Sequence, residues 1–268
     1  MREMLLKDIC FVTSSMGRLA HIKKSLPVIL SQPSSKTVVV DYSCPDKTGD
    51  WVKENYPECS VVEVPGEKYF CLTKARNASI PEIKKLDCEW LCFVDADTIV
   101  SDNFVEKIQK LLEESIFITG YNIYNKVKGL GGLLIVSKKD FLKVGGYDEA
   151  ITGYGTNASE MRLRLYFNDL SYKILPEGMA HHINHSYSET FSKYREDNQI
   201  SLYENTKVLL KKIRRWEAET GKKVPRELYK KDQIRWIESE LPVDRYPFIQ
   251  LKVLARKIFT KFRLMFTG

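Results

Sequence analysis

At 268 residues, with 43% hydrophobic and 29% charged residues, the chain is long enough to bury a full core and has the composition of a soluble globular protein. No apolar run approaches the roughly 20 residues that span a bilayer, and the N-terminus lacks the features of a signal peptide. The net charge of +7 is uneven, because residues 190–268 hold 19 Lys plus Arg against 10 Asp plus Glu. This argues against a nucleic-acid-binding surface on the first part and predicts that the basic tail meets an anionic partner.

The first ninety residues alternate strand patterns with helix patterns. Strands are expected over residues 9–14, 36–41, 60–64 and 90–94, and helices over 19–30, 50–55 and 72–85, the last interrupted at Pro81. Such alternation predicts a doubly wound, parallel sheet. No G-x-G-x-x-G follows the first strand, so a dinucleotide site has no support.

The cysteines indicate the redox compartment. The six cysteines show no C-x-x-C spacing, and Cys10, Cys71 and Cys92 lie in apolar runs typical of buried segments. In a chain of this length these features favour reduced, packed thiols over a disulfide framework. We therefore expect a cytoplasmic protein.

Polar side chains stand at the ends of three predicted strands. Thr13 and Ser14 end the first, Asp41 ends the second, and Asp95 and Asp97 end the fourth. In one open sheet these ends line one edge, where ligands bind. The arrangement suits a nucleotide, with its base near the first two strands and its diphosphate near the fourth. For Asp41, a turn-opening role is at least as good an interpretation.

The acidic pair Asp95-Ala96-Asp97 is the central feature. In an extended chain the two carboxylates point to one side and Ala96 to the other. Two such oxygen donors can hold a divalent cation, which can neutralise a diphosphate. Acidic residues at a strand end also cap the following helix, expected here from Asp102 onward. The motif alone leaves the two interpretations about equal.

The glycine-rich stretches of the second half offer a candidate sugar site. Gly131 and Gly132 lie in a loop that enters a strand over residues 133–137, and Tyr154 and Gly155 precede a helix expected over 159–168. Glycines let the backbone approach a ligand, and a tyrosine ring offers a flat surface to a sugar. The alternative is a set of tight surface turns.

Taken together, these stretches resemble the GT-A glycosyltransferases, in particular the family-2-like enzymes and the β-1,4-galactosyltransferase and polypeptide N-acetylgalactosaminyltransferase groups. Residues 74–77 read K-A-R-N, residues 95–97 read D-x-D, and residues 145–149 with 153–155 and Arg164 resemble the G-G-F-D-E … G-W-G … R block. The match runs from the first strand to about Ser186. It implies an α/β fold with a doubly wound mixed sheet, a catalytic domain over 1–190, and a helical basic extension over 191–268.

The resemblance also implies roles for individual residues. Asp97 would be the metal ligand and Asp95, beside Ala96, would face the ribose or sugar of the donor. The residues implied in seating the nucleotide are Thr13, Ser14, Arg18, Asp41, Lys74, Asn77, Asp95 and Ala96. Those implied on the acceptor side are Gly131, Gly132, Tyr154, Gly155 and Glu160. Lys74 would otherwise be an ordinary solvated lysine of a helix.

Three of the four histidines follow a predicted strand. His185-Ser186 matches a metal-binding His before a Ser in the galactosyltransferase group, and His182 lies three residues earlier. A set of Asp97, His182 and His185 suits Mn²⁺ better than an all-oxygen Mg²⁺ site. Ordinary packing of these histidines is the alternative.

One departure concerns the catalytic base. Inverting relatives carry an acidic pair after G-W-G, whereas this chain has Asn157-Ala158. The next carboxylate, Glu160, is assigned as base or acceptor ligand, and whether the configuration is inverted or retained stays open. Two rivals follow: a degenerate protein that binds nucleotide-sugar or glycan without turnover, and a metal-dependent nucleotidyl or phosphoryl transferase.

The tail carries its own patterns. A helix is expected over residues 200–219, followed by a linker with Pro225, Pro242 and Pro247 and by a basic amphipathic helix over 249–266. That last helix could lie on an anionic membrane surface or pack against protein. Membrane contact at the inner face would suit a UDP-sugar-dependent enzyme that acts on a lipid-linked glycan in surface polysaccharide synthesis.

Overall fold

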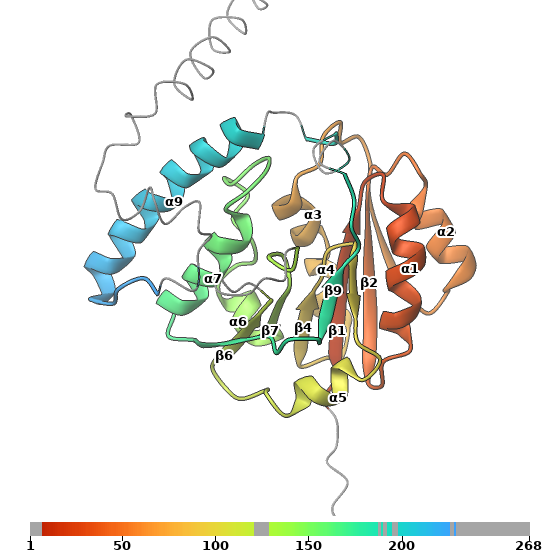
Figure 1. The fold of residues 1–268 in the computed structure, drawn as a ribbon, viewed down its shortest axis with the longest axis horizontal. Helices are drawn as coiled ribbons and strands as arrows, with labels where there is room; N and C mark the ends of the chain where they lie inside the picture. Colours follow the sequence, from red (N-terminus) through yellow and green to blue (C-terminus); the bar gives the residue numbers. More distant parts are fainter. Residues whose placement is uncertain are drawn as a thin grey trace, which may run out of the picture.

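The computed structural model describes residues 7–120, 129–186, 189, 192–194, 198–225 and 228 (Figure 1). A seven-stranded sheet in the order β3-β2-β1-β4-β7-β6-β8 forms the centre, and β5 and β9 form a separate two-stranded sheet. The strands are β1 (Ile9–Ser15), β2 (Ser35–Tyr42), β3 (Ser60–Val64), β4 (Trp90–Phe93), β5 (Thr98–Val100), β6 (Ile116–Thr119), β7 (Leu134–Ser137), β8 (Ser171–Ile174) and β9 (Ala180–His182). The helices are α1 (Leu19–Leu30), α2 (Thr48–Asn55), α3 (Leu72–Ala78), α4 (Ile80–Lys85), α5 (Phe104–Gln109), α6 (Lys138–Lys143), α7 (Asn157–Phe167) and α9 (Asn198–Thr220).

The first half follows the pattern that the sequence predicts. Strand β3 and helix α1 have the predicted bounds, and β1, β2 and α2 differ from them by two residues or fewer at each end. The helix expected over 72–85 is divided into α3 and α4, and the division falls at Ser79 rather than at Pro81. Pro81 lies in the first turn of α4, where a proline costs no helical hydrogen bond.

The sheet is mixed, and the strands of the first ninety residues pair in parallel as predicted. Strands β3, β2, β1 and β4 pair in parallel, whereas β7 runs antiparallel to both β4 and β6. Strands β6 and β7 are consecutive along the chain and adjacent in the sheet, and such neighbours pair antiparallel because no crossover returns the chain to the first edge. The mixed sheet implied by the resemblance is confirmed.

Helices cover both faces of the sheet, which explains the apolar runs of β1 and β4. Alternate residues of β4 divide between two core clusters: Leu91 and Phe93 pack toward α4, α6 and α7, and Trp90 and Cys92 toward α1 and α5. A strand buried on both faces needs apolar residues at every position. All six cysteines are free and buried, as the sequence predicts.

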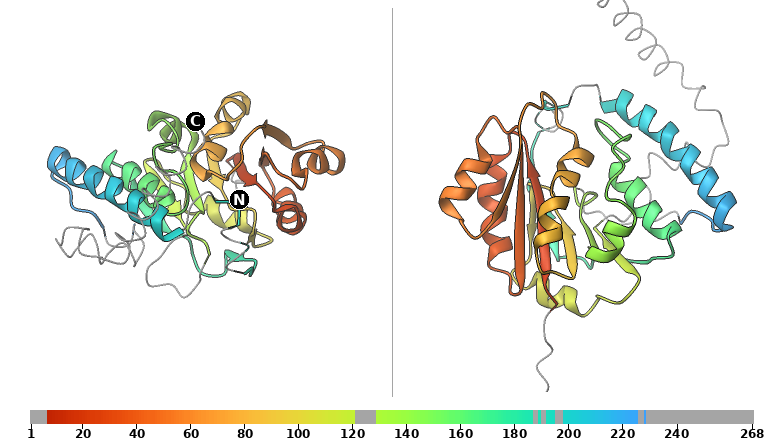
Figure 2. Two further views of the ribbon diagram at one scale, coloured as in Figure 1. Left: turned by 90° about the horizontal axis from the view of Figure 1, so that it is seen from above. Right: turned by 180° about the vertical axis from the view of Figure 1, so that it is seen from behind.

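Helix α9 belongs to the same core although the sequence assigned it to an extension beginning at 191. Its residues Leu209, Ile213 and Trp216 join the cluster that contains Phe167 of α7, and the Trp216 and Phe167 rings lie 5.3 Å apart. Figure 2 shows α9 beside α7, at the end of the molecule away from α1 and α2. The predicted helix over 249–266, with Pro242 and Pro247, lies outside the described residues. Within the described ranges, no helix combines the length and apolar character needed to cross a bilayer.

Candidate metal and nucleotide site

Strand pairing brings the acidic motif next to the histidines. Asp97 lies between β4 and β5, and β5 pairs antiparallel with β9 so that Thr98 is opposite His182. The N–H of Ile183 donates to the Asp97 carbonyl at 2.7 Å and extends this pairing by one bond. Ala96 turns the other way and is buried in a cluster with Ile22. The motif itself forms a turn, because the Thr98 N–H donates to the Asp95 carbonyl at 2.9 Å, so the extended conformation assumed for the predicted alternation was wrong.

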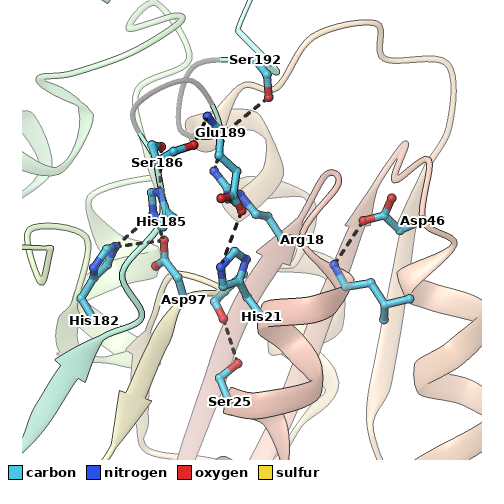
Figure 3. A network of polar contacts seen from close by, with 12 residues as sticks. Arg18, His21, Ser25, Asp46, Asp97, His182, His185, Ser186, Glu189 and Ser192 are labelled. Carbon is cyan, nitrogen blue, oxygen red and sulfur yellow. Dashed lines mark hydrogen bonds and ion pairs between the residues drawn. The ribbon is translucent and has the colours of Figure 1, made fainter.

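Three ligand atoms converge at this point, as Figure 3 shows. The distance from Asp97 Oδ2 is 2.8 Å to His185 Nε2 and 3.3 Å to His182 Nε2, and the two Nε2 atoms are 3.1 Å apart. All three side chains are partly buried. These are the three residues that the sequence predicts as metal ligands.

The donor set fits a divalent cation better than it fits a set of hydrogen bonds. An octahedral ion with ligands at about 2.2 Å places adjacent ligand atoms about 3.1 Å apart, close to the three separations between Asp97, His182 and His185. Without an ion, Nε2 of His185 faces a carboxylate oxygen and a second imidazole nitrogen, and one imidazole position cannot serve both well. One carboxylate and two imidazoles match Mn²⁺ and similar ions.

Asp95 is held by a buried arginine that the sequence analysis did not assign to the site. Arg76 of α3 is 1% exposed; it donates to Asp95 Oδ1 at 2.8 Å and to the Tyr147 hydroxyl at 2.7 Å. Its guanidinium also lies over the rings of Phe93 and Tyr147. Burial alone disfavours its charge, but Tyr147 and Asp95 together raise the pKa of Arg76 above its ordinary value. The K-A-R-N motif contained this signal, since a cation that precedes an acidic pair by 19 positions can bind either a phosphate or a carboxylate in the fold.

The glycine loop at residues 129–132 packs closely against Asp95 and His182. A Cβ atom on Gly132 would lie 2.1 Å from Asp95 Oδ2, and one on Gly129 would lie 2.4 Å from the His182 ring. Gly129 also has a φ of +92°, which favours glycine. The carbonyl of Gly131 accepts from Arg162 at 2.8 Å. This loop was predicted on the acceptor side, and the structure places it against the acidic motif and His182.

Several residues predicted to seat the nucleotide have contacts within the protein. Asp41 accepts from the backbone N–H of Cys44 at 2.7 Å and of Gly49 at 2.6 Å, as the turn-opening interpretation expects. Lys74 is exposed and lies 3.7 Å from Glu67. Contact of these side chains with a nucleotide stays a prediction.

Asn77, Thr13 and Ser14 were also predicted to seat the nucleotide, and the structure gives their surroundings. The Asn77 amide donates to the Tyr147 carbonyl and to Glu149, and it accepts from the Tyr147 N–H, so it fastens the segment that follows α6. Thr13 and Ser14 are buried at the end of β1, and Thr13 Oγ1 has no hydrogen-bond partner among the described residues. The Asn77 contacts support a structural role in place of the predicted one.

Glu160 is an ion-pairing residue of the core. Its side chain is 1% exposed, and it accepts from Arg164 at 3.0 Å and from Lys212 of α9 at 2.8 Å. A general base must reach the hydroxyl that it deprotonates, and the oxygens of Glu160 are already engaged by two cations. These contacts give no support to the predicted role of Glu160 as base, because α9 covers the helix that carries it.

Tyr154 and Gly155 lie beneath the segment that follows the histidines. The Tyr154 ring meets the Tyr194 ring edge to face at 5.8 Å, and the carbonyls of both predicted residues accept from Asn205 of α9. Burial and the nearby Asp95 charge raise the pKa of Tyr194. Contact of the Tyr154 ring with a sugar stays a prediction.

Arg18, the remaining residue predicted to seat the nucleotide, lies at the start of α1. Its guanidinium donates to Glu189 Oε1 at 2.5 Å and to the Glu189 carbonyl at 2.8 Å (Figure 3). His21, one turn along α1, lies 3.7 Å from the same carboxylate oxygen and meets the His185 ring at 5.7 Å. The sequence analysis gave no role to His21 or Glu189, because only the folded chain places them beside Asp97.

The mixed seven-stranded sheet with helices on both faces is the GT-A fold of glycosyltransferases, which the solved structures below share. Residues 114–189 match a family described as the N-terminal domain of galactosyltransferase, and they include both histidines of the candidate metal site. No curated protein matches the sequence.

Solved structures show the same fold at low sequence identity. TarS 1–349 from S. aureus has a TM-score of 0.57 at 14% identity, over 77% of this chain and 65% of that one. Its complex with UDP-GlcNAc has a TM-score of 0.59 at 13% identity, over 77% and 66%. The mannosyltransferase PcManGT from Pyrobaculum calidifontis, in complex with GDP-Man and Mn²⁺, has a TM-score of 0.59 at 14% identity, over 93% and 74%. The chain thus spans 65% of the length of the TarS structure.

Proposed function

We propose that the protein is a metal-dependent glycosyltransferase that moves a sugar from a nucleotide-sugar donor, a UDP-sugar, to a glycan or lipid-linked glycan acceptor. The observation that carries the proposal is the convergence of Asp97, His182 and His185 at the ligand-binding edge of a GT-A sheet. The nucleotide-sugars bound by TarS and PcManGT support the donor class. The TarS complexes with UDP and with UDP-GlcNAc support UDP as the nucleotide.

The proposed roles follow from the geometry. Asp97, His182 and His185 would hold Mn²⁺, and the ion would stabilise the negative charge of the departing nucleoside diphosphate. Arg76 orients the Asp95 carboxylate, and Gly132 leaves space for it. Asp95 would face the ribose or sugar of the donor. The base for the acceptor hydroxyl is left unassigned, because Glu160 is buried in ion pairs.

A second candidate is a protein that binds nucleotide-sugar without turnover. Two observations favour it: Asn157-Ala158 stand where relatives carry an acidic pair, and Glu160 is engaged by Arg164 and Lys212. Release of UDP from a UDP-sugar, with and without acceptor glycans, separates the two candidates. Turnover supports the enzyme, and tight binding without turnover supports the binding protein.

A thermal-shift experiment tests the metal site. We expect Mn²⁺ to raise the melting temperature of the wild type, and UDP-sugars to raise it further only with Mn²⁺, because a ligand that binds the native state stabilises it. Asp97→Asn and His185→Ala should lose both effects. His181→Ala is the matched control, since His181 is the exposed neighbour of His182 on β9. Equal Mn²⁺ responses in all four proteins would contradict the proposal, and protection by nucleoside triphosphates alone would favour a nucleotidyl transferase.

The basic tail leads to a proposal about location. A cytoplasmic enzyme peripheral to the inner membrane face would reach lipid-linked acceptors through the amphipathic helix expected over 249–266. Sedimentation with vesicles that contain anionic lipid tests this. Replacement of Lys252, Arg256 and Lys257 by glutamate should abolish binding, and unchanged binding would argue against it.

A further inference from the structure

We propose that Arg18 and His21 form a diphosphate-binding subsite beside the metal ligands, and that Glu189 occupies this subsite until a diphosphate displaces it. The identity of the ligand rests on the proposed function. The competition between Glu189 and an anion rests only on the contacts of these three side chains.

Glu189 meets Arg18 as an anionic ligand would. One guanidinium nitrogen donates to the Glu189 carboxylate at 2.5 Å and the other to the Glu189 carbonyl at 2.8 Å. Guanidinium groups bind phosphate and carboxylate with the same paired geometry. The Arg18 side chain is 15% exposed and the Glu189 side chain 43% exposed. The cation is therefore part of the folded site, whereas the carboxylate approaches from outside.

His21 connects this subsite to the metal ligands. It is 8% exposed, and its Nδ1 has no hydrogen-bond partner among the residues that the structure describes. Its Nε2 lies 3.7 Å from Glu189 Oε1, and its ring lies against that of His185. Figure 3 shows Arg18 and His21 side by side from α1, with Asp97 and His185 directly beyond. A diphosphate held by an ion on His185 would therefore have oxygens within reach of α1.

Two described residues that flank Glu189 in the chain, Ser186 and Lys193, also have defined contacts. Ser186 Oγ accepts from the Glu189 N–H at 3.1 Å, and the Lys193 carbonyl accepts from the Phe70 N–H at 2.8 Å. A Cβ atom on Gly17 would lie 2.5 Å from the Lys193 side chain, so Lys193 brings a further positive charge to this loop. A diphosphate carries more negative charge than one carboxylate, so it competes well for this cluster of cations.

An ordinary surface ion pair is the alternative, in which Glu189 only fastens its own segment to α1. The two interpretations predict different changes in anion affinity when Glu189 is replaced. A fastening contact, once removed, leaves anion binding unchanged or weaker. An occupant, once removed, makes anion binding tighter, because the apparent dissociation constant is the intrinsic one divided by the fraction of molecules with a free subsite.

Titration with inorganic pyrophosphate in the presence of EDTA tests whether replacement of Glu189 tightens or weakens anion binding. If Glu189 fills the subsite in about 70–90% of molecules, Glu189→Gln should tighten pyrophosphate binding by about 3- to 10-fold. Asp46→Asn is the matched control, since Asp46 is an exposed carboxylate that accepts from the Leu19 N–H at 3.3 Å without contacting Arg18. It should change binding by less than about 2-fold, as expected for a screened charge. Arg18→Gln combined with Glu189→Gln should lose the gain.

The outcomes separate this inference from the proposed function. Unchanged or weaker binding in Glu189→Gln, or an equal gain in Asp46→Asn, would overturn the subsite even if UDP-sugars are bound and turned over. A gain that depends on Arg18 would support it even if no nucleotide-sugar is bound, which would refute the proposed function alone. Glu189→Ala, with melting temperatures of all variants, guards against a misfolded protein.

Discussion

Replacement of Arg76 by methionine should destabilise the protein substantially, although Arg76 lies within a helix and methionine has a similar length. The change removes the 2.8 Å ion pair with Asp95, the 2.7 Å hydrogen bond to Tyr147, and the cation–π contacts with Phe93 and Tyr147. It leaves the Asp95 carboxylate next to an apolar side chain.

The exposure of the Asp95 side chain determines how much stability the Arg76→Met change should cost. Removing one partner of a fully buried pair costs about 3–5 kcal/mol, because the other charge is left without compensation. The Asp95 side chain is 32% exposed and keeps access to water, so we expect a smaller loss. We expect about 2–3 kcal/mol in the free energy of unfolding, which corresponds to about 4–6 °C in melting temperature for a chain of this size.

Urea denaturation at pH 7 measures this loss. Arg215→Met is the matched control, because Arg215 makes an exposed pair with Glu219 at 3.7 Å and its removal should cost under about 0.5 kcal/mol. Arg76→Lys keeps the charge but not the paired donors, so it should lie between the wild type and Arg76→Met. A loss for Arg76→Met within about 1 kcal/mol of the control would refute the reasoning.

Three further predictions follow from the site and its supports. Gly132→Ala should weaken binding of UDP-sugar with Mn²⁺ by about 10-fold or more in a calorimetric titration, because the new Cβ would lie 2.1 Å from the first carboxylate of the D-x-D motif; unchanged affinity would contradict the close approach. Lys212→Met should cost about 1–3 kcal/mol in denaturation, because Lys212 neutralises the buried Glu160, whereas the exposed neighbour Lys211→Met should cost little. Burial opposes the charge of Asp148, but its bond to Lys212 lowers the pKa of that carboxyl. The stabilisation by the ionised Asp148 carboxylate is therefore full above its unfolded pKa of about 4 and is lost as the pH falls through the lower folded pKa. The difference in unfolding free energy between the wild type and Asp148→Asn should then narrow only below about pH 4. A difference that already narrows at pH 6 would contradict this.

The sequence by itself determined the elements of the first half and the chemistry of the site. The bounds of α1 and β3 follow from periodic apolar residues and turn residues, which act within a few positions of each other. The choice of Asp97, His182 and His185 as metal ligands came from the resemblance to the GT-A glycosyltransferases, and the structure brings these three side chains together. The predicted bounds of α1 and β3 agree with the structure because the residues that set them lie close together in the sequence.

Tertiary structure decided the rest. The direction of β7 depends on which strands become neighbours, and the burial of Glu160 depends on Lys212 arriving from α9. Glu189 meets Arg18 across 171 positions of the chain. Contacts of this kind are set by sheet register and helix packing rather than by any local pattern. For that reason Glu160, which the sequence suggested as a base, lies in a core ion pair, and Glu189, which was unassigned, lies beside the candidate metal site.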